Sequence, residues 1–227
     1  MNDFLTEAEL DARLPQWAAK VGEYKDRFRT LDPRKAALVV VDMQNEFLTD
    51  TGMIPVWGGP AIIRRLAELM AAFRRAGRPV IHTRHCYRNP EIDAGATGQW
   101  WKLDRNSRLL NVNSPGSEIH PALTPQQDEY VIVKQRYSGF FATNLDSLLR
   151  MFDVRDVVVA GVASNCCCEA TAHDAFFRDY HVFFLADGTG GSDEASHVAV
   201  LRDIAWTYGT VLTCAKVADQ LERSVAQ

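Results

Sequence analysis

Six short, continuous apolar runs alternate with helix-like patterns along the chain, and this feature constrains the fold most. They cover residues 37–41, 79–81, 130–133, 157–160, 182–185 and 210–212. Continuous rather than alternating apolar runs are typical of strands that helices cover on both faces. Strands that alternate with helices form βαβ units. The sequence therefore predicts a three-layer, doubly wound α/β fold with a mainly parallel six-stranded sheet.

Helical periodicity separates several of these runs. Apolar side chains recur at three- and four-residue steps, and cap signals lie at the ends of two patterns. The patterns are Ile62, Leu66, Leu69 and Phe73 with Gly77 at the C-cap position, a capping box at Thr143 and Asp146, a face with Ala172 and Phe176 within residues 169–180, and the run Val198, Leu201 and Ala205.

Two segments fall outside this alternation. Residues 1–34 are predicted to form a helical N-terminal extension that packs on the body or on a neighbouring subunit, which leaves 35–227 as the main domain. Residues 84–128 show little periodicity and contain Trp100 and Trp101. Loops of this length are typically functional or mobile.

Charge and hydropathy exclude several classes of protein. The net charge of −4 argues against nucleic acid as a partner, because such proteins carry a basic footprint. No run approaches the roughly 18 apolar residues of a membrane span, and residues 1–11 lack a secretory signal pattern. We therefore expect a cytoplasmic protein without a membrane partner.

The five cysteines do not form a disulfide or zinc pattern. Their number is odd, and Cys166, Cys167 and Cys168 are adjacent, which suits neither a disulfide framework nor a structural zinc site. In a reducing compartment they are thiols. Cys86 and Cys214 are interpreted as small buried side chains.

Reactive side chains follow three of the predicted strands. Asp42 comes after the first strand, Lys134 after the third, and the cysteine cluster just after the fourth. Ligands of open parallel sheets bind beyond the carboxyl ends of the strands, so these groups are candidates for one catalytic site. Taken singly, the Asp is better explained as a cap and the Lys as a surface residue.

The segment 161–167, Gly-Val-Ala-Ser-Asn-Cys-Cys, is the most informative. A strand ends at Gly161, a tight turn follows, and a helix begins near the cysteines. A thiol at a helix N-terminus is expected to have a lowered pKa, and free backbone N–H groups there could stabilise an oxyanion. The alternative is that the cysteines only fill apolar space; we expect at least one to be a nucleophile.

Three motifs together resemble the isochorismatase-like cysteine hydrolase superfamily. They are residues 40–47 (Val-Val-Asp-Met-Gln-Asn-Glu-Phe), 134–141 (Lys-Gln-Arg-Tyr-Ser-Gly-Phe-Phe) and 161–167. The resemblance covers roughly residues 36 to 215, so 35–227 is expected to be an isochorismatase-like hydrolase domain. The second motif and residues 145–150 look most like ureidoacrylate amidohydrolases. Biuret, triuret and N-carbamoylsarcosine hydrolases are similar families.

The resemblance implies roles for individual residues. Cys167 is implied as the nucleophile, Asp42 as general base and acid, and Lys134 as its electrostatic partner. It also implies a cis peptide bond between Val162 and Ala163, and an oxyanion hole formed by the Ala163 and Cys167 amides. Cys166 and Cys168 are interpreted as packing residues.

Two departures from other branches of the superfamily matter. Nicotinamidases carry metal-binding histidines after the first motif, but residues 50–57 contain no His, so neither a metal nor another cofactor is expected. True isochorismatases lack the cysteine nucleophile, so Cys167 argues against that activity. The histidines, His82 and His85 included, are expected to be core or surface residues.

The expected activity is hydrolysis of a C–N bond in a small ureido or carbamoyl compound through a thioester. The alternatives are another small carboxamide amidase, a catalytically inactive scaffold and a thiol-redox protein. We expect a homo-oligomer, a dimer or tetramer. The candidate substrate-binding residues are Asn45, Phe47, Tyr137 and Phe141, with Trp57, Trp100 and Trp101 as further candidates.

Overall fold

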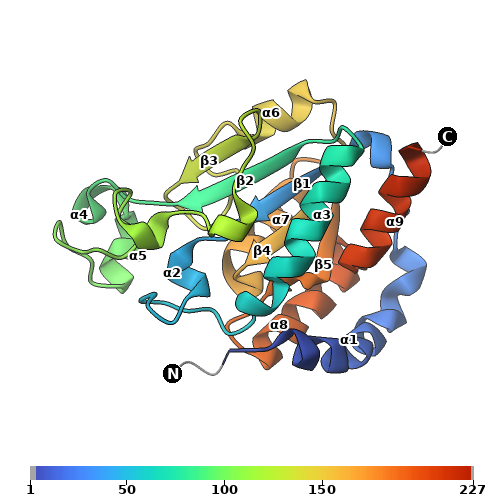
Figure 1. Cartoon of the computed structure of the whole chain (residues 1–227), viewed down its shortest axis with the longest axis horizontal. Helices are drawn as coiled ribbons and strands as arrows, with labels where there is room; N and C mark the ends of the chain where they lie inside the picture. Colours follow the sequence, from blue (N-terminus) through green and yellow to red (C-terminus); the bar gives the residue numbers. More distant parts are fainter. Residues whose placement is uncertain (1–3, 226–227) are drawn as a thin grey trace.

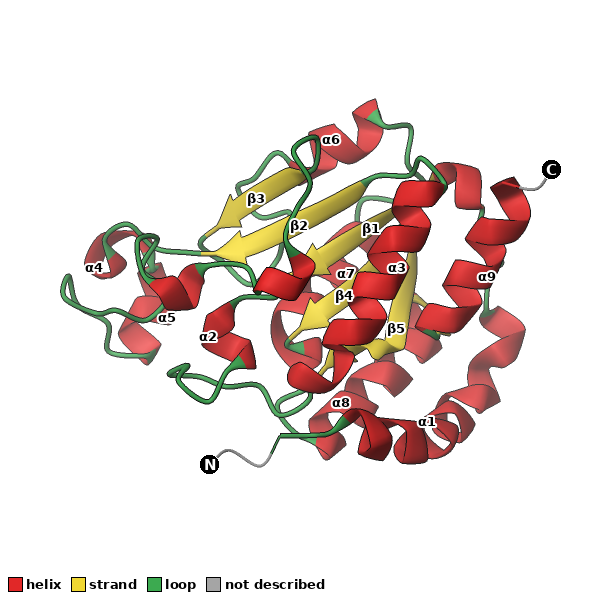
Figure 2. Ribbon diagram, viewed as in Figure 1, coloured by secondary structure: helices red, strands yellow, loops and turns green. Residues whose placement is uncertain are grey.

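One six-stranded sheet forms the centre of the molecule (Figures 1 and 2). The computed structural model describes residues 4–225. The strand order is β3-β2-β1-β4-β5-β6, and every neighbouring pair is parallel, so the predicted doubly wound fold is confirmed. The strands are β1 (Ala36–Val41), β2 (Val80–His85), β3 (Tyr130–Lys134), β4 (Asp156–Val162), β5 (His181–Gly190) and β6 (Gly209–Leu212).

Helices cover the sheet. The helix α3 (Ile63–Arg75) packs against β1, β2 and β5 and against α9 (Cys214–Val225), while α7 (Glu169–Phe176) packs against β4 and β5. Figure 1 shows α3 and α9 in front of the sheet and α7 behind it. All residues of β1 and β4 are buried, as expected for central strands between two helical layers.

The end of α3 shows why the chain turns where the sequence predicted. Gly77 has a φ of +61°, a left-handed conformation that glycine adopts without a steric penalty. Its N–H donates to the Arg74 carbonyl (3.0 Å), and the Arg78 N–H donates to the Phe73 carbonyl (2.9 Å). These two bonds close the helix and direct the chain into β2.

Three local expectations were wrong. The helix α6 (Leu145–Met151) begins after Asn144 without a capping box, because the Thr143 hydroxyl donates to the Gly139 carbonyl and Asp146 accepts from the Tyr180 hydroxyl. In α7, Ala172 is buried but Phe176 is exposed. The strand β5 continues through Asp187 to Gly190, since its pairing with β4 resumes after an irregularity.

The N-terminal segment packs on the body of the same chain. The helix α1 (Glu7–Val21) begins with a capping box at Thr6 and Glu9 and lies against α8 (Glu194–Asp203). The indole of Trp17 is buried and donates to Glu194 (2.9 Å). Packing, rather than the helix alone, therefore holds this segment in place.

The long segment after β2 lies beyond the carboxyl ends of the strands (Figure 1). It contains the short helices α4 (Pro90–Asp93) and α5 (Gly95–Trp100). The bridges Tyr87–Asn111 and Gln44–Ile119 connect it back to itself and to the segment after β1. Within residues 4–225, no helix combines the length and apolar character that crossing a membrane requires.

Candidate active site

Asp42 is held at the carboxyl end of β1 by its neighbour on β2. Its backbone has a φ of 48°, an uncommon conformation that aspartate tolerates better than most residues. The Thr83 hydroxyl donates to Oδ1 of Asp42 (2.6 Å) and accepts from its backbone N–H (3.1 Å). Both residues are buried, so the carboxylate has a fixed orientation.

Lys134 forms a buried ion pair with this carboxylate. Its Nζ lies 2.6 Å from Oδ2 of Asp42, and both side chains are fully buried. Nζ also donates to the Arg136 carbonyl (3.0 Å). Burial favours a lower pKa for Lys134, but Asp42 and Cys167 outweigh it and raise this pKa. The ammonium therefore stays charged and balances the carboxylate.

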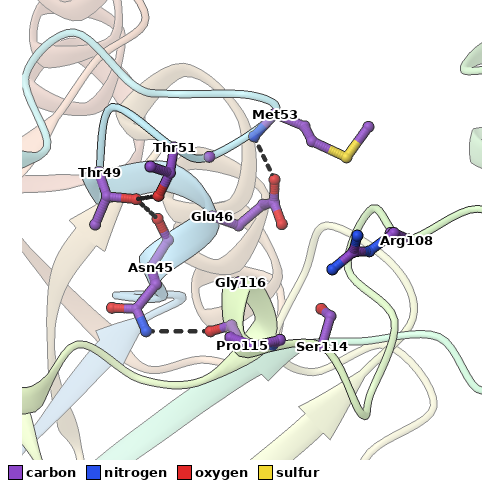
Figure 3. A pocket seen from close by; sticks show the side chains of 10 residues that line it. Asn45, Glu46, Thr49, Thr51, Met53, Arg108, Ser114, Pro115 and Gly116 are labelled. Atoms are coloured by element: carbon purple, nitrogen blue, oxygen red, sulfur yellow. Dashed lines mark hydrogen bonds between the residues drawn. The ribbon is translucent and has the colours of Figure 1, made fainter.

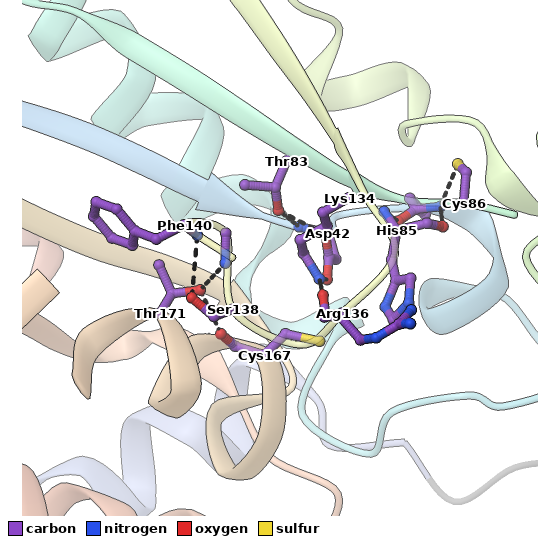
Figure 4. Close-up of polar contacts among 12 residues, drawn as sticks. Asp42, Thr83, His85, Cys86, Lys134, Arg136, Ser138, Phe140, Cys167 and Thr171 are labelled. Carbon is purple, nitrogen blue, oxygen red and sulfur yellow. Dashed lines mark hydrogen bonds and ion pairs between the residues drawn. The ribbon is translucent and has the colours of Figure 1, made fainter. Parts of the chain in front are cut away.

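Cys167 meets this pair from the turn after β4 (Figure 4). Its Sγ, a carboxylate oxygen of Asp42 and a ring nitrogen of His85 all lie within 4.8 Å of one another. The expected lowering of the Cys167 pKa was wrong. The hydrogen bond with the Cys166 thiol and burial raise this pKa, against the opposing effect of Lys134. Cys167 therefore rests as a thiol and needs a base.

The cysteines on either side differ in environment. Cys168 is fully buried, and burial raises the pKa of its thiol, which agrees with a packing residue. Cys166 is only half-buried and borders the same cavity as Cys167. Its pKa is lowered by the hydrogen bond with Cys167.

The backbone around the nucleophile is tightly bonded. The Val162–Ala163 peptide bond is cis. The Ala163 carbonyl accepts from the amides of Cys166 (3.0 Å) and Cys168 (3.1 Å). The Thr171 hydroxyl donates to the Cys167 carbonyl (2.6 Å). These bonds shape a π-turn over Ser164–Cys168 that leads directly into α7.

A cavity of about 320 Å³ opens over Cys167, a volume suited to a small molecule. Three of the predicted substrate-binding side chains, Phe47, Tyr137 and Trp101, line it. The complete lining is Phe47, Ile54, Pro55, Val56, His85, Tyr87, Thr97, Trp101, Leu103, Leu109, Leu110, Tyr137, Ala163, Cys166, Cys167 and Ser192.

The other candidate binding residues lie elsewhere. Asn45, the first residue of α2 (Asn45–Leu48), lines a separate pocket, where its amide donates to the Pro115 carbonyl (Figure 3). Phe141 and Trp100 are exposed, and Trp57 stacks with Arg13. None of these four lines the cavity over Cys167.

Three residues of the site were missed in the sequence. Thr83 orients Asp42, while His85 and Tyr87 line the cavity and lie 2.8 Å apart between Nε2 and the hydroxyl oxygen. His85 is buried, as expected of a core residue, yet it faces the reactive groups. His85 could have been found from its position, because it ends β2 and is paired there with Lys134, at the same end of the sheet.

In the part of the chain that the structure describes, two groups of side chains have a geometry compatible with metal binding. In the group Asp42, His85 and Cys167, the Lys134 ammonium already balances the carboxylate at 2.6 Å. The second group is Glu169, His173 and Asp203. It lies on α7 and α8, and none of its members lines the cavity over Cys167.

The fold and the site define an α/β protein with a buried cysteine–carboxylate–ammonium cluster. The chain is also similar to known proteins. Residues 36–216 match the isochorismatase domain family. A ureidoacrylate amidohydrolase of Methylobacterium radiotolerans is 36% identical over 199 residues, which cover 80% of this chain and 77% of the relative. Nicotinamidase 3 of Arabidopsis thaliana is 33% identical over 206 residues, covering 89% and 95% respectively.

A solved structure agrees with these sequence relatives. A cysteine hydrolase from Pseudomonas syringae superposes with a TM-score of 0.82 at 32% identity, covering 87% of this chain and 97% of that protein. The chain belongs to the isochorismatase family and is a hydrolytic enzyme.

Proposed function

We propose that this enzyme hydrolyses a C–N bond of a small ureido or carboxamide compound through a thioester on Cys167. The observation that carries the proposal is the arrangement of Sγ of Cys167 within 4.8 Å of the Asp42 carboxylate, which itself lies 2.6 Å from the Lys134 ammonium. A thiol, a base and a fixed cation in one cluster beneath a cavity are the groups that cysteine-based acyl transfer requires.

In the first half of the reaction, Asp42 removes the proton from the Cys167 thiol. The raised pKa of this thiol makes such a base necessary, and Lys134 stabilises the emerging thiolate. The sulfur attacks the substrate carbonyl carbon and forms a tetrahedral intermediate. Asp42 then returns the proton to the departing nitrogen, and ammonia or an amine leaves.

In the second half, the thioester reacts with water. Asp42 takes a proton from the water, whose oxygen attacks the thioester carbonyl, and the acid is released as Cys167 regains its proton. In both halves we assign stabilisation of the oxyanion to the amides of Ala163 and Cys167. Loss of one such donor typically raises a barrier by about 2.7–4 kcal/mol.

The choice between ureido and other carboxamide substrates rests on similarity. The resemblance to ureidoacrylate amidohydrolases favours a ureido compound, and the nicotinamidase relative keeps an ordinary carboxamide as the alternative. Both substrate classes use the same three catalytic groups.

A test of the function is release of ammonia from a panel of ureido compounds and carboxamides. We expect turnover of at least one class, and a loss of at least about 1,000-fold in Cys167→Ser. Cys166→Ser and Cys168→Ser are matched controls, since each changes one neighbouring sulfur, and both should keep most of the activity. Turnover that survives in Cys167→Ser would contradict the proposal, as would a dependence on all three sulfurs, which indicates redox chemistry.

A further inference from the structure

The wall of the cavity over Cys167 differs chemically from the catalytic cluster beneath it. This cluster, Asp42, Lys134 and Cys167, is called the floor here; Cys167 lines the cavity, whereas Asp42 and Lys134 lie buried behind it. Among the described residues, 4–225, no Arg, Lys, Asp or Glu side chain lines the cavity. Two cations act on the lining residues His85 and Tyr87 from outside the cavity. Lys134 is committed to Asp42 and to the Arg136 carbonyl, and the Arg136 guanidinium donates to the carbonyls of Asp93 and Gln135. Most of the wall is apolar, including Val56, Leu109 and Leu110.

This wall is a poor environment for a substrate carboxylate. An ionised group that leaves water without a charged or hydrogen-bonding partner carries a large desolvation cost. The polar wall groups are the hydroxyls of Thr97 and Ser192, the phenols of Tyr87 and Tyr137, the Trp101 indole, the His85 ring and the Cys166 thiol, and none of them belongs to Arg or Lys. Burial is the main cause that lowers the pKa of His85 to about 3, so its ring is neutral near pH 7 and supplies no positive charge.

The Tyr87 hydroxyl is held in place by His85. Its oxygen lies 2.8 Å from Nε2 of His85, and the two groups share one hydrogen bond. A neutral imidazole nitrogen either donates or accepts, and a phenol can do both. Whichever of the two donates, the Tyr87 oxygen keeps a lone pair that can accept from a group in the cavity.

From this arrangement we infer that the cavity selects an uncharged primary amide or urea with an apolar remainder, and that the Tyr87 oxygen, oriented by His85, binds a substrate N–H. A carboxylate-bearing ureido acid is rejected by the same wall. This inference rests on the proposed function and assigns Tyr87 and His85 as specificity-determining residues of that site.

Matched pairs of compounds test the charge preference. Butyramide and succinamate differ only in a methyl against a carboxylate, as do propyl-substituted and carboxyethyl-substituted ureas. We expect kcat/KM for ammonia release to be at least about 100-fold higher for the uncharged member, because the wall cannot replace carboxylate hydration. Leu103→Lys places a cation on the wall and should shift the preference toward the acid, whereas the matched control Leu103→Gln should not.

Tyr87→Phe tests the role of the hydroxyl. We expect KM for a primary amide to rise about tenfold with kcat largely kept, as for the loss of one hydrogen bond. The preference for butyramide over N-methylbutyramide, followed by product detection with NMR, should shrink in this variant. An unchanged KM and an unchanged preference would overturn the assignment of Tyr87.

The outcomes separate the inference from the proposed function. If the acids are cleaved as well as or better than their uncharged partners in a Cys167-dependent reaction, the inference is overturned and the proposed function stands. If no ureido compound or carboxamide of either charge is cleaved, the proposed function is overturned, and the inference fails with it.

Discussion

The floor and the wall of the cavity are built by different means. The floor consists of Asp42, Lys134 and Cys167, which follow the carboxyl ends of strands and are fixed by the sheet and by buried bonds. Much of the wall comes from residues 97–110, in the segment after β2, and includes the exposed Trp101. The contrast teaches that the chemistry depends on the sheet and the specificity depends on a segment that can vary without disturbing it.

The largest expected effect is on the floor. Lys134→Met leaves the Asp42 carboxylate buried without a partner, which should lower the free energy of unfolding by about 3–5 kcal/mol and abolish ammonia release. Lys35→Met is the matched control, because Lys35 pairs with Asp153 at the surface, where water screens the two charges and the loss of the pair has little effect on stability. Equal urea-unfolding midpoints for the two variants would remove the distinction between floor and surface.

A smaller effect is expected on the free energy of unfolding at acid pH. It comes from His85, which lines the cavity and lies close to Asp42 and Cys167. His85 has a pKa of about 3 in the folded chain against an ordinary value of 6.5. Between these pH values the unfolded chain binds a proton that the folded chain does not, so the free energy of unfolding falls as the pH is lowered. The contribution of His85 is about 1.4 kcal/mol per pH unit.

His85→Gln should remove this share of the pH dependence. The measurement is the unfolding free energy of both proteins in urea at several pH values between 6.5 and 4. His197, whose pKa burial lowers to about 4, supplies a similar slope in both proteins and serves as an internal reference. Parallel curves for wild type and His85→Gln would show that His85 is not buried in its neutral form.

The smallest expected effect is on the wall. Trp101→Ala should raise KM about tenfold while kcat changes little, because the indole contacts substrate without touching the reacting atoms. Trp100→Ala is a close control, since Trp100 is 82% exposed and does not line the cavity. A fall in kcat for Trp101→Ala would place this wall residue in the chemical step instead.

The same contrast explains what the sequence could reveal. The sequence alone could predict that Asp42, Lys134 and Cys167 lie together, because parallel strands carry their carboxyl ends to one edge of the sheet. The apolar runs identified all six strands, although β5 is longer than its run. These features follow from local patterns and general rules of sheet topology.

The wall could not be predicted in this way. Asn45 lies within the first motif, yet a short helix turns its side chain toward Pro115. Tyr87 reaches the cavity through a bridge to Asn111, a contact that leaves no periodic signal. The raised pKa of Cys167 depends on its burial and on the thiol of Cys166, and three-dimensional packing decides both.

A double-mutant cycle in kcat/KM tests most directly that the floor acts as one unit. We predict that Asp42→Asn and Cys167→Ser each lower ammonia release by at least about 1,000-fold, and that the double variant is hardly worse than either, because groups that act together are strongly non-additive. Losses that multiply in the double variant, or an Asp42→Asn enzyme of near wild-type activity, would contradict the account.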